Sequence, residues 1–485
     1  MRTGESYLES LRDGRTVLLD GEAVEDVTEH WAFAEQARRI ATMMDRTAQD
    51  TTGELTALDE ETGERFANMW LIPRTGEDLA RRRSGHLAWA ESSFGLMGRS
   101  PDHVASALTA MAGAADLFDQ AHEGFGANVR AFHEKAKRES LYCSYVIVPP
   151  QIDRSQPAHR QPEPFLYAGV SAERDDGIVL TGAQMVGTAA VFSDYVLVTQ
   201  IRPLEPGDED YAFSAVVPIS APGLTLHPRV PYGSTEDKSF DYPLSSKLDE
   251  TDSVVIFKDV FVPWEQVFVI RDREMVMRQW SATGANVLSN WQALNRFTVK
   301  MSFASGLARK LAELHRIDQV RPVRAQLGGS IAVDTVSMQA VVEAAMRHSE
   351  PIAGMAIPGP QYVNGGLNMQ RRIAYDAVRT LRELAGGAFM ALPSSYQSMV
   401  HPDTAADVEK YYQSTGIDTI GRVGFLKLMW DFVGTEFAGR QQQYELFYAG
   451  QPHINDVRVF DTFDWQQGVD LVDRALVELR AGADG

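Results

Sequence analysis

The sequence predicts an α+β protein in which a helical segment, a β-rich segment and a second helical segment follow one another. Apolar residues recur every three or four positions before residue 140, and short β-branched and aromatic runs replace them from 141 to 272. Long helical periods return after 273. A chain of 485 residues with 44% hydrophobic and 23% charged residues has the composition of a globular protein with a large core. We therefore expect three domains, at 1–140, 141–272 and 273–485.

The first segment is expected to be helical over 30–44, 103–121 and 126–138, because apolar side chains fall on one face of each stretch. Gly124 and Gly126 interrupt the pattern between the last two stretches. The first ten residues lack the apolar core of a secretion signal, so we expect no signal peptide.

The central segment is expected to form an antiparallel sheet or barrel. Turn signals such as Asp175–Gly177 and Pro222–Gly223 separate its apolar runs. The expected strands lie at 145–148, 165–170, 178–180, 195–198, 213–217 and 254–257.

The last segment is expected to be a bundle of long helices whose apolar stripes are wide enough to be buried. The periods cover 290–318, 323–348, 370–385 and 406–447. No apolar run reaches the roughly 18 residues that a membrane-spanning helix needs, so we expect none.

Charge and composition exclude several classes of function. The 46 basic and 66 acidic residues give a net charge of −20, which argues against binding to duplex nucleic acid or to anionic membranes. A single cysteine, Cys143, excludes an intramolecular disulfide and a cysteine-rich metal site, as is typical of a reducing cytoplasm. The eleven histidines show no ligand spacing, so no metal site is predicted. Rossmann, Walker, zinc-protease and nucleophile-elbow motifs are also lacking.

The segment Gly95–His103 has the pattern of a helix start that favours an anion. Ser100 is a good N-cap and Pro101 suits the first helical position. Arg99 then lies just before the helix and His103 in its first turn, so both can face one pocket. The alternative is a simple capped helix with a surface arginine.

Two further segments contain small residues that would let a flat ligand approach the backbone. One is a strand that enters the small-residue stretch Gly187–Ala190, and the other is Ala438–Arg440 within a helical period. A tight turn or bulge is the alternative for the first segment, and close helix packing is the alternative for the second.

Taken together, these segments resemble the 4-hydroxyphenylacetate 3-monooxygenase family, the oxygenase components of two-component, flavin-dependent aromatic hydroxylases. The resemblance runs from about residue 20 to 475. The segments that carry it are Trp89–Asp102, Pro149–Arg154, Thr181–Thr188, Tyr242–Glu265, Leu381–Gly387 and Glu436–Arg440.

The resemblance implies an acyl-CoA-dehydrogenase-like fold with a helical N-terminal domain, a central antiparallel β-barrel and a C-terminal helical bundle. It implies a cytoplasmic homotetramer that receives reduced FAD from a separate NAD(P)H-flavin reductase. Molecular oxygen would then form a flavin C4a-hydroperoxide that hydroxylates a phenolic or other electron-rich aromatic. The protein would exclude water and activate the substrate.

Three positions correspond to the family's substrate pocket, and two of them carry a different residue. Arg99 matches the family's arginine, His103 stands where the family has tyrosine, and Tyr145 falls where the family has histidine. We hypothesise that His103 and Tyr145 exchange roles across one pocket, with Arg99 stabilising a phenolate or oxyanion. The alternative is that the substrate has no phenol to activate.

The resemblance also assigns cofactor contacts. The corresponding positions are Gln151, Arg154, Thr188 (near the flavin N5), Ala438, Gly439, Arg440 and Gln441. Lys247 and Ala438 stand where the family often has arginine and glycine, which leaves contacts at both positions open. Trp291 replaces a family histidine and either stacks on the substrate ring or fills core.

The sequence is also compatible with two other functions. A flavin dehydrogenase of the acyl-CoA dehydrogenase type would use the same fold to act on a thioester with a catalytic carboxylate. A scaffold that kept the fold without catalysis would bind no reduced FAD.

Overall fold

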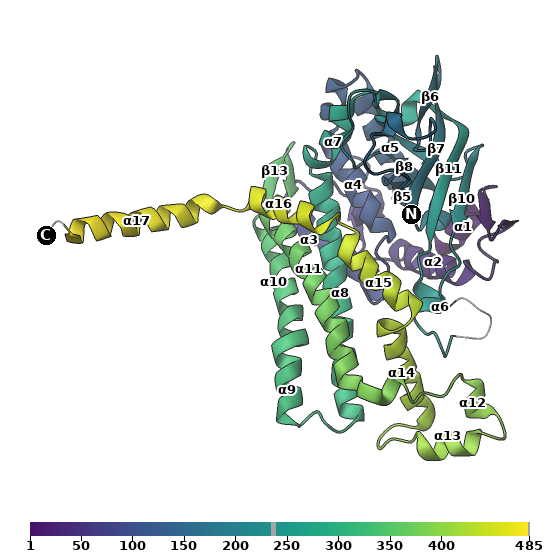
Figure 1. Cartoon of the computed structure of the whole chain (residues 1–485). Helices are drawn as coiled ribbons and strands as arrows, with labels where there is room; N and C mark the ends of the chain where they lie inside the picture. The colour runs from purple at the N-terminus through teal and green to yellow at the C-terminus, as the bar shows by residue number, and fades with distance from the viewer. Residues whose placement is uncertain (234–238, 484–485) are drawn as a thin grey trace.

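The computed structural model describes residues 1–233 and 239–483 (Figure 1). Helices come first along the chain, strands dominate the centre and helices return, which confirms the predicted α+β order. The division into domains at 140 and 272 stays a prediction. The N-terminal helices are α1 (Gly4–Ser10), α2 (Ala34–Ala48), α3 (Gly76–Ser92), α4 (Pro101–Gly113) and α5 (Phe125–Glu139).

The central strands form two open sheets, so the predicted closed barrel is not confirmed in the described part of the chain. The first sheet has the order β2 (Glu22–Ala23), β1 (Thr16–Leu19), β10 (Leu224–Pro228), β11 (Asp252–Pro263), β7 (Gly177–Thr188) and β6 (Gly169–Arg174). The second has the order β12 (Val267–Ile270), β9 (Phe213–Pro218), β8 (Tyr195–Val198) and β5 (Cys143–Val146).

The sheets are also not purely antiparallel. Strand β1 pairs parallel with β10, and β5 pairs parallel with β8. The first of these pairs brings a strand of the N-terminal segment into the central sheet. Two small hairpins complete the β structure, β3 (Thr56–Leu58) with β4 (Arg65–Ala67) and β13 (Glu350–Ile352) with β14 (Met355–Ile357).

Two predicted strand boundaries are wrong for local reasons. The run from Phe165 does not begin a strand, because Phe165 has a φ of 55° and the strand starts only at Gly169. Strand β7 continues through Gly187 and Thr188, which were expected in a loop. The turn comes at Ala189, whose φ is 61°.

The C-terminal segment is helical as expected, but the period over 406–447 is not one helix. It divides into α13 (Ala405–Tyr411), α14 (Thr419–Val433) and α15 (Glu436–Phe447). Asp418 caps the start of α14 and Thr435 caps the start of α15, so each helix begins anew. The remaining helices are α6 (Ser245–Leu248), α7 (Arg273–Ser281), α8 (Ala285–Leu314), α9 (Arg321–Leu327), α10 (Val333–Arg347), α11 (Pro360–Ala385), α12 (Gln397–Val400), α16 (Pro452–Thr462) and α17 (Trp465–Ala483).

Helix α8 joins the two helical segments. It packs against α3 and α4 of the N-terminal segment and against α10 and α11 of the C-terminal segment. Its buried apolar residues include Leu294 and Phe297, while Arg296 and Lys300 form ion pairs with the buried Glu445 of α15 at 2.7 and 2.8 Å. The single Glu445 carboxylate binds both cations, and this shared contact fixes α15 against α8.

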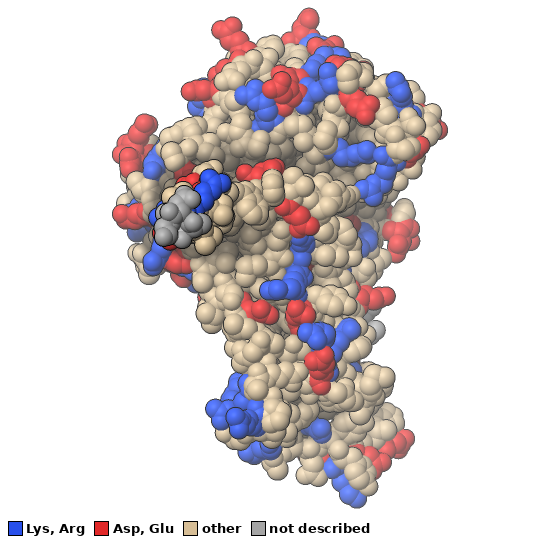
Figure 2. All heavy atoms as spheres, turned by 60° about the vertical axis from the view of Figure 1, so that its left-hand side comes forward, with Lys and Arg blue, Asp and Glu red and all other residues tan. Residues whose placement is uncertain are grey.

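The surface carries both signs of charge. Acidic and basic side chains are interspersed over the face in Figure 2, and the long C-terminal helix α17 extends away from the rest of the molecule in Figure 1. None of the helices within the described ranges is both long and apolar enough to span a bilayer.

Candidate active site

The start of α4 brings Arg99 and His103 together around the Tyr145 side chain, and we call this cluster the Arg99 pocket. Ser100 is the N-cap residue and Pro101 occupies the first turn, as predicted. The Arg99 guanidinium carbon lies 5.1 Å from the centre of the Tyr145 ring, and the Tyr145 hydroxyl lies 3.4 Å from His103 Nε2. Arg99 is 9% exposed and His103 is 2% exposed, so a surface arginine on a simple capped helix does not describe this site.

Two tyrosines that we did not predict complete the surroundings of Arg99. Arg99 Nη1 donates a hydrogen bond of 2.7 Å to the Tyr444 hydroxyl, and the Tyr448 ring centre lies 5.6 Å from the guanidinium carbon. Cations favour the faces of aromatic rings, especially where water is excluded. The guanidinium is therefore held in an aromatic pocket, and Tyr444 is four residues after Arg440 on the same helical face.

The backbone amides at the start of α4 are already occupied. The buried Glu250 carboxylate accepts hydrogen bonds from Gly98 N–H (2.8 Å) and Arg99 N–H. These two amides, which precede α4, are therefore bonded to the protein's own carboxylate, while an anion site formed by Arg99 at this helix start stays a prediction. Burial raises the pKa of Glu250, against the opposing effect of Arg440 and these amides.

Thr188 and Arg440, two predicted cofactor residues from distant segments, meet at the carboxylate of Asp252. The Thr188 hydroxyl donates to Asp252 at 2.6 Å, and Arg440 Nη2 donates to it at 2.8 Å. Arg440 Nη1 also reaches Glu250 at 3.3 Å. Burial acts to raise the pKa of Asp252, but the charges of Arg440 and Arg229 and the hydrogen bonds from Arg440 and Thr188 together outweigh it, and the pKa is lowered. The Arg440 fork therefore binds carboxylates in this structure, and its contact with the cofactor stays a prediction.

The other predicted residues of α15 differ in their surroundings. Gln441 is buried; its amide nitrogen donates to Leu96 O at 2.8 Å and its oxygen accepts from Lys300 at 2.9 Å. Ala438 is also buried. At Gly439 an added Cβ would meet nothing within 4 Å, so close helix packing does not explain this glycine.

Gln151 and Arg154 lie on an exposed loop. In the described residues, no hydrogen bond or ion pair joins either side chain to the Arg99 pocket. Arg154 lines a cavity of about 120 Å³ together with Gln200 and Arg202. The amide nitrogen of buried Gln200 has no hydrogen-bond partner among the described residues, so this cavity offers a donor as well as two cations.

Trp291 is a core residue in this structure. It is wholly buried, its indole N–H donates to Val342 O at 3.2 Å, and its ring meets the edge of His86 at 5.9 Å. These contacts favour core filling over the alternative of stacking on a substrate ring.

The residue that follows Trp291 contacts the pocket instead. Gln292 Oε1 lies 2.9 Å from His103 Nδ1, and Gln292 Nε2 lies 3.1 Å from Asp102 Oδ2. Burial lowers the pKa of His103 well below its ordinary value, and the charge of Arg99 acts in the same direction. His103 is therefore a neutral imidazole near pH 7, which is able to accept a proton.

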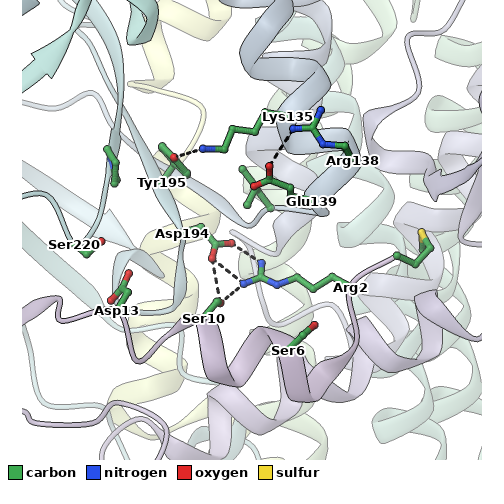
Figure 3. Close-up of a pocket in the computed structure, with 13 residues that line it drawn as sticks. Arg2, Ser6, Ser10, Asp13, Lys135, Arg138, Glu139, Asp194, Tyr195 and Ser220 are labelled. Carbon is green, nitrogen blue, oxygen red and sulfur yellow. Dashed lines mark hydrogen bonds and ion pairs between the residues drawn. The ribbon is translucent and has the colours of Figure 1, made fainter.

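A separate hollow near the N-terminus has no such arrangement (Figure 3). Its polar groups bind one another: Arg2 pairs with Asp194 at 2.7 Å, Arg138 pairs with Glu139 at 3.2 Å, and Lys135 donates to the Tyr195 hydroxyl at 2.6 Å. We therefore place the chemistry at Arg99 and not here. In the described part of the chain, no group of three or more His, Cys, Asp or Glu residues has the arrangement of a metal site.

Comparison with known proteins gives consistent matches over nearly the whole chain. Residues 3–269 match the family model described as "4-hydroxyphenylacetate 3-hydroxylase N terminal", and residues 276–477 match its C-terminal counterpart. The 4-hydroxyphenylacetate 3-monooxygenase oxygenase component of Thermus thermophilus is 33% identical, over 95% of this chain and 93% of that protein.

A second relative is a monooxygenase from Streptomyces globisporus named for a carrier-protein-bound 3-amino-3-(3-chloro-4-hydroxyphenyl)propanoyl substrate. It is 33% identical over 92% of this chain and 85% of that protein. A crystal structure of a 4-hydroxyphenylacetate 3-monooxygenase oxygenase component with FAD and 4-hydroxyphenylacetate superposes with a TM-score of 0.92 at 31% identity, covering 100% of both chains. Glutaryl-coenzyme A dehydrogenase shares the fold, with a TM-score of 0.53 at 12% identity over 96% of this chain and 94% of that one.

The contact between Gly98 and Tyr444 yields a first prediction. A Cβ at Gly98 would overlap the Tyr444 ring, so Gly98→Ala must displace the tyrosine that binds Arg99. We expect a loss of about 1–3 kcal/mol in the free energy of unfolding, seen as a lower melting temperature. Gly76→Ala is the control, because a Cβ there meets nothing within 4 Å. Equal melting temperatures for the two variants would contradict the packing described.

Proposed function

This chain belongs to the 4-hydroxyphenylacetate 3-hydroxylase family, and we propose that its Arg99 pocket binds and activates a phenol. The protein is a reduced-FAD-dependent monooxygenase that hydroxylates an aromatic compound, and it uses FAD and molecular oxygen. As an oxygenase component, it receives reduced FAD from a separate reductase. The observation that carries the proposal for the pocket is the buried Arg99 guanidinium beside the neutral His103 and the Tyr145 hydroxyl.

In this proposal His103 is the general base. Its Nε2 takes the proton as the phenol O–H bond breaks, which leaves a phenolate and an imidazolium. The buried Arg99 stabilises the phenolate oxygen, because its charge is little screened where water is excluded. Deprotonation enriches the ring in electrons at the positions next to the hydroxyl, so it prepares those carbons for attack by an electrophilic oxygen. FAD, when bound in its reduced form, supplies the activation of molecular oxygen.

In this proposal Tyr145 takes the role that His103 leaves open, because the two residues exchange the positions of the family's tyrosine and histidine. Its hydroxyl faces His103 Nε2 at 3.4 Å and its ring faces Arg99, so it orients the base and the cation together. A substrate without a phenol would need neither a buried base nor a buried cation. The pairing of His103 with Arg99 therefore favours the exchange over that alternative.

The residues predicted for FAD fit the cofactor in part. The small cavity beside Arg154 and Arg202 offers two cations to a phosphate group, and α15 is open at Gly439. We propose that the loop carrying Gln151 and Arg154 and the Gly439 face of α15 hold FAD. Thr188 and Arg440 instead shape the site through Asp252.

The substrate class follows from two relatives. Both relatives are named for a substrate with a 4-hydroxyphenyl group, one as a free acetate and one bound to a carrier protein. We propose 4-hydroxyphenyl compounds as the class that this enzyme accepts, with 4-hydroxyphenylacetate as the first probe.

A thioester dehydrogenase is the weaker assignment. Its resemblance to this chain is one of fold alone. Glu250, a buried carboxylate beside Arg99, already accepts from Gly98, Arg99 and Arg440. A catalytic carboxylate must be free to take a proton from the substrate, and Glu250 is not.

We also propose that the chain assembles into a homotetramer through its C-terminal helix. One face of α17 carries apolar residues at helical spacing, and all of them are about half exposed or more. An apolar helix stripe in water is unfavourable unless another helix covers it. The stripe consists of Trp465, Val469, Val472, Leu476 and Leu479.

The role of His103 is tested by His103→Ala. With reduced FAD, oxygen and 4-hydroxyphenylacetate, we expect the rate of hydroxylated product formation to fall about 10²- to 10⁴-fold, the usual contribution of a general base. The wild type should keep its rate at pH values well below 6.5, because burial and Arg99 lower the pKa of His103. The exposed His122→Ala is the control. An unchanged rate and pH profile in His103→Ala would refute the proposed base.

The FAD contact is tested by Gly439→Ala. The added methyl enters open space on a helix, so the melting temperature of the protein without FAD should stay the same or rise slightly. If FAD lies on this face, anaerobic titration with reduced FAD should give at least a tenfold higher Kd. Gly365→Ala, also open and helical, should leave the Kd unchanged. Equal affinities in the two variants would place FAD elsewhere.

The proposed assembly is tested by Leu476→Asp, which puts a charge into the apolar stripe of α17. We expect light scattering to show a smaller species than the wild type at the same concentration, because a buried unpaired charge is unfavourable. Gln467→Asp adds the same charge on the opposite face of α17 and should leave the mass unchanged. A wild-type monomer, or a Leu476→Asp variant with wild-type mass, would exclude this helix as the contact.

A further inference from the structure

The Gln292 side chain lies between two polar groups of helix α4. Its amide nitrogen is 3.1 Å from Asp102 Oδ2, and its amide oxygen is 2.9 Å from His103 Nδ1. Gln292 is 1% exposed, Asp102 is wholly buried and His103 is 2% exposed. The three side chains therefore form a hydrogen-bonded row that is closed to solvent.

Asp102 determines the direction of the hydrogen bonds in this row. Its carboxylate receives the Ser100 hydroxyl at 2.6 Å and His86 Nδ1 at 2.7 Å, in addition to the Gln292 amide. An ionised carboxylate only accepts hydrogen bonds, and an amide donates only through its nitrogen. The NH₂ group of Gln292 must therefore face Asp102, which turns the Gln292 carbonyl oxygen toward His103.

A carbonyl oxygen in turn only accepts, so His103 Nδ1 has to carry a hydrogen. A neutral imidazole has one N–H, and the lone pair is then on Nε2, the atom that faces the Tyr145 hydroxyl. His103 stays neutral because burial lowers its pKa, and the charges of Arg99, Arg296 and His86 lower it further against the Gln292 hydrogen bond.

We propose that Gln292, anchored by Asp102, is a positioning residue that fixes His103 in its Nδ1–H tautomer and so presents the Nε2 lone pair to the phenol. This role rests on the function proposed above. When the phenol O–H bond breaks, the hydrogen goes to Nε2 and the electron pair stays on the phenolate oxygen. The positive charge on the ring is then stabilised by the Gln292 carbonyl and, beyond it, by the carboxylate of Asp102.

The opposite tautomer would not function as a base. With the hydrogen on Nε2 the ring is able only to donate toward the pocket, and its lone pair would face the Gln292 carbonyl, where two acceptors repel each other. Gln292 thus acts without touching the substrate, and its contribution is distinct from that of Arg99.

The experiment compares two substitutions at Gln292 in the full-length protein. Gln292→Met has a similar size but no carbonyl oxygen at this position, whereas Gln292→Glu keeps an oxygen that accepts from His103 Nδ1 in either protonation state. Gln279→Met is the matched control, since Gln279 is a buried glutamine that bonds Thr199 instead.

The first measurement is ¹⁵N NMR of the histidine-labelled protein without substrate, with His103 assigned by the signals that His103→Ala loses. We expect an N–H signal at Nδ1 and an unprotonated Nε2 in the wild type, in Gln292→Glu and in Gln279→Met. Gln292→Met should show a mixture of tautomers or a change to Nε2–H. A wild-type Nε2–H, or a Gln292→Met spectrum with the wild-type tautomer, would overturn the proposal.

The second measurement is hydroxylation of 4-hydroxyphenylacetate with reduced FAD and oxygen. We expect Gln292→Met to lower kcat about 10- to 100-fold with little change in KM, and Gln292→Glu to restore most of the rate. Equal losses in both variants would indicate a merely structural role and would overturn the proposal. Should Gln292→Met fail to fold, the wild-type and Gln292→Glu spectra decide alone. A wild type with the expected tautomer but no hydroxylation would refute the proposed function and leave the tautomer assignment standing.

Discussion

The geometry of the site depends on one buried carboxylate, that of Glu250. It joins three distant parts of the chain, since it accepts from the amides that precede α4 and from Arg440 on α15 while it belongs to the loop before β11. A carboxylate without partners in this position would cost several kcal/mol, so the segments that donate to it are held where they are. The hydrogen bond to Glu250 holds the Arg99 backbone in position. Tyr444, which accepts a hydrogen bond from Arg99, is on the same helix as Arg440. The same carboxylate therefore fixes both the position of Arg99 and the docking of α15.

Local patterns in the sequence predicted what depends on neighbouring residues. The order of helical and β-rich segments, the start of α4 and the common pocket of Arg99 and His103 all follow from caps and spacing within a few residues. Strand pairing does not, because it joins distant residues. The parallel pair of β1 with β10 places two residues more than 200 positions apart side by side, and no local pattern indicates it. For the same reason the contacts of Gln292 with His103 and of Glu250 with Arg99, at separations of 189 and 151 residues, were not predictable.

Arg440 shows a second limit of sequence reasoning. A guanidinium fork matches a carboxylate as well as a phosphate, so an arginine next to small residues is compatible with either partner. The structure decides for the carboxylate of Asp252. Trp291 is a similar case, because an aromatic residue in a helical period either lines a pocket or fills a core, and only its contacts with Val342 and His86 distinguish the two. Both Asp252 and Glu250 lie within the Tyr242–Glu265 segment, whose significance the resemblance indicated without saying which residues act.

The hydrogen-bonded row of His103, Gln292 and Asp102 continues to His86 and ends there, inside the protein. His86 is 1% exposed, and its Nε2 has no hydrogen-bond partner in the part of the chain that the structure describes. An amide in its ordinary form orients its neighbours but does not conduct a proton from one to the other. His103 can therefore hold one additional proton, but the row of side chains behind it does not carry that proton to bulk water. In the proposed mechanism, the proton that His103 takes on Nε2 therefore has to leave from the Nε2 side of the ring, where the Tyr145 hydroxyl lies 3.4 Å away, before His103 can act as a base again.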